Sequence, residues 1–159
     1  MIARHINGFL NEYVPSQKSS SSHTLKSYRY ALALYISFLE IKKGISPERL
    51  CGECFDREII EQWLKWLIDK RSCSPETYNN RLASLRAFLK YLGSREISLL
   101  HLCQDATRIP RKKQVRKKVK GMSKKAVQAL LQVPDLSTKA GQRDLTLMII
   151  MYSTAARMD

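Results

Sequence analysis

The sequence lacks the apolar segments that a membrane or an export pathway requires. No apolar run approaches the roughly 20 residues that span a bilayer, and LTLMIIMY is far too short. The first fourteen residues place His5, Asn7, Asn11 and Glu12 where a secretory signal needs a continuous apolar stretch. The composition is that of a soluble globular protein. We therefore expect a cytoplasmic protein with reduced cysteines and no membrane partner.

Acidic residues are scarce relative to basic ones. The 14 Asp and Glu residues accompany 28 Lys and Arg, which gives a formal net charge of +14. Such a charge attracts polyanions over a long range, with nucleic acid as the default partner and an anionic membrane surface as the second. Residues 108–125, here called the basic segment, hold ten basic residues and no acid. This clustering is typical of nucleic-acid binding, and a solvated linker that only aids solubility is the alternative.

The sequence offers little that could hold a metal ion. Cys51 and Cys54 form a C-x-x-C pair, but no second pair follows at a zinc-site spacing. Cys73, His101 and Cys103 remain only as possible further ligands. Because free cysteine commonly behaves as a small apolar residue, we predict neither a metal nor a cofactor.

Apolar periodicity predicts helices, and no strand pattern occurs before residue 105. Ser22 and Ser74 are predicted helix caps, and Pro15, Gly44 and Gly93 are predicted helix ends. The first unit is therefore predicted to be an all-α bundle of four or five helices. Its predicted helices span residues 2–14, 23–43, 56–71, 74–92 and 97–104.

The composition changes after this bundle. The basic segment is too charged for a packed core and is predicted to be an extended linker. Ser123 then caps a helix that Pro134 ends, and Gly141 precedes a final helix from about Gln142 to Tyr152. The predicted division is a helical domain (1–106), a basic linker (107–121) and the start of a second domain (122–159).

Stretches in both units resemble the tyrosine recombinase family, which includes phage integrases and Xer-type site-specific recombinases. HTLKSYRYALALYISFL resembles the second helix of the family's core-binding domain, and SPETYNNRLASLRAFLKYL resembles its fourth. MSKKAVQALLQ and GQRDLTLMIIMYSTAAR resemble the opening of its catalytic domain. The resemblance implies a SAM-like core-binding bundle, a basic linker and the first helices of a truncated catalytic domain. It covers almost the whole chain but only about the N-terminal half of such an enzyme.

The resemblance also implies an activity and partners. The family cuts and rejoins double-stranded DNA through a 3′-phosphotyrosine, without a cofactor, with several protomers on the DNA. Arg157 matches its first catalytic arginine, whose guanidinium binds phosphate oxygens, although Ala155 stands where the family usually has glycine. The family's other catalytic residues lie downstream. We therefore predict that this stretch alone does not cleave DNA, because an arginine without a nucleophile is no phosphoryl-transfer site.

The DNA contacts implied by the resemblance lie on two helices and the linker. The second and fourth helices would approach adjacent major grooves, and the linker would cross the duplex. Linker cations supply affinity and salt dependence but not sequence choice. Arg86 lies on the opposite flank of its helix and is interpreted as structural. The predicted DNA-binding residues are Lys26, Ser27, Tyr30, Thr77, Asn80, Arg81, Ser84, Arg111, Lys112, Lys113, Arg116, Lys117 and Lys118.

The predicted function is DNA binding by the N-terminal portion of a site-specific recombinase, with no small-molecule substrate and with nucleoid association when DNA is bound. One alternative is a stand-alone DNA-binding protein that competes or assists at recombination sites. Another is an RNA- or ribosome-associated basic helical protein. The apolar residues 144–152 are expected to pack against 123–133, to cause self-association or to remain frayed.

Overall fold

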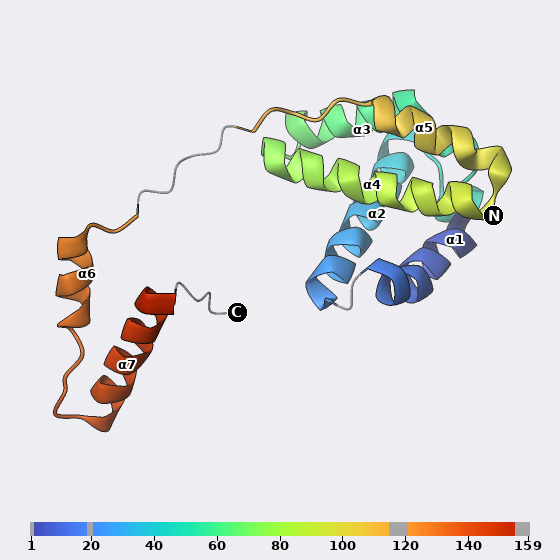
Figure 1. Cartoon of the computed structure of the whole chain (residues 1–159). Helices are drawn as coiled ribbons and strands as arrows, with labels where there is room; N and C mark the ends of the chain where they lie inside the picture. The colour runs from blue at the N-terminus through green and yellow to red at the C-terminus, as the bar shows by residue number, and fades with distance from the viewer. Residues whose placement is uncertain (1, 19–20, 115–120, 155–159) are drawn as a thin grey trace. The chain divides into compact units, whose positions relative to one another are not determined.

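The computed structural model describes residues 2–18, 21–114 and 121–154. The chain divides into two compact units, Met1–Val115 and Arg116–Asp159. Helices make up both units, and no strand occurs within the described ranges (Figure 1). The predicted all-α class is confirmed. No helix in the described ranges has the length and apolar character needed to cross a membrane.

The helices occur close to where the apolar periodicity places them. The first unit contains α1 (Ile2–Gly8), η1 (Phe9–Lys18), α2 (Ser22–Lys43), η2 (Pro47–Arg49), η3 (Gly52–Phe55), α3 (Arg57–Asp69), α4 (Pro75–Arg95), η4 (Ile97–Leu99) and α5 (Leu100–Arg108). The second contains α6 (Lys124–Leu131) and α7 (Lys139–Thr154).

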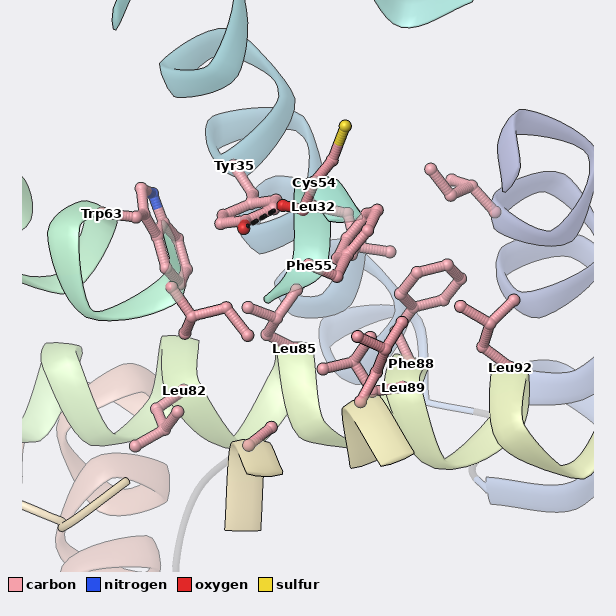
Figure 2. Close-up of a cluster of buried hydrophobic side chains, with 14 of the residues drawn as sticks. Leu32, Tyr35, Cys54, Phe55, Trp63, Leu82, Leu85, Phe88, Leu89 and Leu92 are labelled. Carbon is pink, nitrogen blue, oxygen red and sulfur yellow. Dashed lines mark hydrogen bonds between the residues drawn. The ribbon is translucent and has the colours of Figure 1, made fainter. Parts of the chain in front are cut away.

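Helix α4 is the centre of the first unit. Helices α2, α3 and α5 all pack against it, and its apolar side chains face those of the other elements in Figure 2. Leu85 and Phe88 of α4 are fully buried together with Phe55 and Trp63. The Tyr35 hydroxyl donates a hydrogen bond of 2.7 Å to the Cys54 carbonyl inside this core, and burial raises the pKa of Tyr35 well above its ordinary value. The buried core thus fixes α2, η3 and α3 against α4.

Two of the predicted helix ends are wrong. Helical backbone continues through Pro15 to Lys18 as a π-helix, in which Phe9 and Val14 are fully buried. Burial of these neighbours outweighs the helix-breaking tendency of proline. Helix α4 likewise continues past Gly93, because this glycine faces α5. A Cβ at this position would lie 3.2 Å from the Cα of Leu100, so the glycine permits close helix packing.

The predicted start of the last helix is also wrong. Helix α7 begins at Lys139, because the Thr138 hydroxyl accepts a 3.0 Å hydrogen bond from the Gly141 N–H. Gly141 is buried against the Asp135 backbone and lies within the helix. Helix α7 packs on α6, which is one of the three outcomes expected for residues 144–152. The apolar side chains of α7 that remain exposed are Leu147, Ile149, Ile150, Met151 and Tyr152.

The N-terminus of α4 is held by the serine that the sequence predicted as its cap. The Ser74 hydroxyl accepts a 3.2 Å hydrogen bond from the Thr77 N–H. We expect Ser74→Ala to lower the free energy of unfolding by about 1 kcal/mol, because this amide loses its acceptor. Urea unfolding monitored by tryptophan fluorescence measures the change. The predicted cap role of Ser22 is wrong, because Ser22 is the first residue of α2 and Ser21 is its N-cap. Ser22→Ala is therefore the matched control. Equal losses in the two variants would contradict a capping role for Ser74.

Candidate nucleic-acid interface

A shallow hollow separates the N-terminal half of α2 from the middle of α4. Three of the predicted DNA-binding residues, Ser27, Asn80 and Ser84, line it. Ser84 lies at its floor: the residue is largely buried, and its hydroxyl donates a 2.9 Å hydrogen bond to the Asn80 carbonyl. His23 and Thr24, which the prediction had not included, also line this α2–α4 hollow.

A second hollow lies between α4 and the start of the basic segment. Arg111, Lys112 and Gln114 form one side of it, and Asn79, Asn80 and Ala83 of α4 form the other. Asn80 and Ala83 line both hollows. The two hollows therefore form one continuous surface, here called the shared surface, which runs from α2 across α4 to the basic segment.

Arg81 connects the two helices beneath the shared surface. Its guanidinium carbon lies 4.7 Å from the centre of the Tyr30 ring, which is 56% exposed. The Nε and Nη1 atoms of Arg81 are buried and have no hydrogen-bond partner among the described residues. Stacking of a guanidinium on an aromatic ring is favourable. Both residues were predicted to contact DNA, and the structure places them against each other across the α2–α4 contact.

Arg86 holds the end of α5. Its Nε donates a 2.8 Å hydrogen bond to the Ala106 carbonyl, and its Nη2 donates to the carbonyls of Thr107, at 3.1 Å, and Ile109. These carbonyls belong to the last turn of α5 and the residue after it, where a helix leaves acceptors unpaired. The contacts agree with the interpretation of Arg86 as structural.

Burial and a neighbouring cation both act on the Arg86 guanidinium. Burial lowers the pKa of the Arg86 guanidinium, and the positive charge of Arg111 lowers it further. Lys112 lies in the same region, with its Nζ 5.4 Å from the centre of the Tyr78 ring. The start of the basic segment thus places two cations, Arg111 and Lys112, beside α4.

Asn79 contacts the chain beyond α5 through both ends of its amide group. Its Nδ2 donates a 2.9 Å hydrogen bond to the Lys112 carbonyl, and the Lys112 N–H donates a 2.9 Å hydrogen bond to its Oδ1. The prediction had passed over Asn79. Its position next to the predicted residue Asn80 could have pointed to it. Its bonding partner, however, lies 33 residues away in the sequence.

The remaining predicted residues either line neither hollow or lie outside the described residues. Lys26 and Lys113 are exposed, and Thr77 takes part in capping α4, its hydroxyl 3.0 Å from that of Ser74. The residues outside the described ranges are Arg116, Lys117, Lys118 and Arg157.

The cysteine pair lies away from the residues that line the shared surface. The Sγ atoms of Cys51 and Cys54 are 3.5 Å apart in the short turn before α3. Burial raises the pKa of the Cys54 thiol. Within the part of the chain that the structure describes, no three His, Cys, Asp or Glu side chains gather as a metal site would require.

The fold corresponds to a known protein family. The family model for the phage integrase N-terminal SAM-like domain matches residues 10–99, more than half of the chain. The chain belongs to this family. The match begins within η1 and ends at η4, so it includes α2 and α4 but not the basic segment.

Curated relatives agree with this family. A putative integrase/recombinase, y4rD, of Sinorhizobium fredii is 28% identical over 158 residues, covering 99% of this chain and 56% of the relative. The tyrosine recombinase XerD of Pseudomonas putida is 30% identical over 143 residues, covering 89% and 44%. The tyrosine recombinase XerC of Bacillus subtilis is 25% identical over 155 residues, covering 92% and 45%. The chain spans about half the length of the curated relatives it matches. No solved structure matches it significantly.

Proposed function

We propose that this chain is the DNA-binding portion of a site-specific tyrosine recombinase, and that duplex DNA lies on the shared surface. The observation that carries the proposal is the continuity of this surface. Polar side chains of α2 and α4 suit base edges and phosphates, and the cations Arg111 and Lys112 adjoin them. Direct readout would come from the helices, and affinity from the basic segment.

The proposal extends to the whole protein. Residues 1–106 would form the core-binding domain, 107–121 the linker and 122–159 the start of the catalytic domain. Arg157 would bind the scissile phosphate during strand exchange by a phosphotyrosine mechanism. Other protomers on the same DNA would be its partners, and the protein would act on the nucleoid in the cytoplasm. The relatives named as tyrosine recombinases support this reading.

Ala83 offers a direct test, because it lies where the two hollows meet. We expect Ala83→Glu to weaken binding to duplex DNA at least 10-fold near 0.1 M salt, since the new carboxylate repels phosphates at the centre of the surface. Fluorescence anisotropy with a labelled duplex measures the affinity. The matched control is Ala33→Glu, which adds the same charge to an exposed position of α2 outside both hollows. Equal losses of affinity in both variants would contradict the proposal that DNA lies on the shared surface.

Competition separates DNA binding from the RNA-binding alternative. Unlabelled duplex DNA should displace the labelled duplex at a lower concentration than a structured RNA of equal charge. A base-paired RNA presents a narrow major groove that side chains do not read, so contacts from α2 and α4 would be lost. Preferential displacement by RNA would favour the RNA-binding alternative.

A further inference from the structure

The chain beyond α5 is held to α4 at two successive places. Arg86 donates hydrogen bonds to the carbonyls at the end of α5. Asn79 lies about two helical turns earlier in α4 and forms hydrogen bonds with both the N–H and the C=O of Lys112. The chain therefore runs back along α4 toward its N-terminal end, as the trace that leaves α5 in Figure 1 also shows. These contacts lie within the first unit.

The contact between Asn79 and Lys112 fixes the backbone of Lys112. The lysine side chain takes no part in it and can contact DNA. An asparagine amide has a donor and an acceptor side by side, so it pairs with the N–H and C=O of one residue as a neighbouring strand would. The two bonds are both 2.9 Å long, within the normal range for N–H···O bonds. The Lys112 Nζ lies over the Tyr78 ring, where it adjoins the second hollow.

We propose that Asn79 is a positioning residue for DNA binding. By holding Lys112 in place, it keeps the cations of Arg111 and Lys112 beside Asn80 and Ala83 and fixes the start of Lys113, so that helix and linker meet the duplex as one surface. The inference rests on the proposed function. Arg86 supports the same arrangement by fixing the end of α5, but Asn79 acts nearest to the cations.

The expected advantage is preorganisation. A free basic chain must lose conformational freedom when its side chains settle on phosphates, and that loss lowers the affinity. A chain already held at Lys112 loses less. Asn79 carries no charge, so its removal changes neither the net charge nor the number of cations. A loss of affinity in an alanine variant comes either from displaced cations or from a lost contact between Asn79 itself and DNA, and removal of the cations separates the two causes.

A double-mutant cycle tests the proposal in the whole chain. Asn79→Ala should weaken duplex binding about 5-fold near 0.1 M salt in the otherwise unchanged protein. In a background where Arg111, Lys112 and Lys113 are all glutamine, the same change should cost less than about 2-fold, because no cations remain to be positioned. Asn11→Ala is the matched control, an exposed asparagine in helical backbone of the same unit. It should leave both affinities unchanged.

A measurement on the protein alone separates this inference from the proposed function. Amide exchange at Lys112 should be faster in Asn79→Ala than in the unchanged chain, since its N–H loses its acceptor. Faster exchange together with a charge-dependent affinity loss would support the proposal. An equal loss in both backgrounds, or no loss despite faster exchange, would overturn it while leaving DNA binding intact. If the unchanged protein did not bind duplex DNA, the proposed function would fail first and this inference with it.

Discussion

Replacing Arg111, Lys112 and Lys113 together with glutamine is expected to weaken duplex binding about 100-fold near 0.1 M salt. Each cation that neutralises a phosphate contributes about 0.9 to the slope of log K against log salt. Loss of all three should therefore flatten the slope by about 2.7 units. Anisotropy titrations between about 0.05 and 0.3 M salt measure both quantities.

A second triple variant controls for net charge. Lys42, Lys43 and Lys65 surround a separate hollow beside Trp66, at the C-terminal end of α2 and on α3. Their replacement with glutamine removes the same three charges, and it should change the slope by less than one unit. If both triple variants changed the slope equally, binding would follow the overall charge and would need no defined surface.

Phe88→Ala is expected to have the largest effect on stability. The Phe88 ring is fully buried, with its centre 5.5 Å from that of Phe9 and 5.7 Å from that of Phe55. It therefore joins α4 to both η1 and η3. Deletion of a buried phenyl group costs about 3–5 kcal/mol through lost burial and the cavity that remains. We expect a loss of this size in the free energy of unfolding.

Tryptophan fluorescence during urea unfolding measures this loss selectively. Both tryptophans of the sequence, Trp63 and Trp66, lie in α3 of the first unit. Ile97→Ala is the control, because Ile97 is 86% exposed and its truncation should change stability by less than about 0.5 kcal/mol. A loss below about 1 kcal/mol for Phe88→Ala would contradict its central place in the core.

The local pattern of apolar residues was sufficient to predict the main helices. The stripe through Tyr78, Leu82, Leu85 and Leu92 follows one face of a helix, and all four side chains are buried in α4. The end of this helix was predicted less well. Gly93 ends a helix by its conformational freedom or permits close packing by its size, and only the contact with α5 distinguishes these roles.

The candidate site was predictable only where it depended on charge or on the resemblance. The basic segment was visible from composition, and the polar faces of α2 and α4 from their place beside the apolar stripes. The bonds of Asn79 and Arg86 were not, since side-chain contacts with distant backbone groups leave no periodic trace in a sequence. Ser84 shows that a polar residue beside the apolar stripe need not be exposed. Its hydroxyl forms a hydrogen bond within α4, and the residue is largely buried.

The pairing of Asn79 with Lys112 also determines where the chain tolerates added length. Between Ile109 and Lys112 the backbone is held at both ends, by Arg86 and by Asn79. A residue inserted there must bulge outward or break one attachment. Insertions and deletions should therefore be poorly tolerated within residues 109–112, because the two attachments fix the length of this segment.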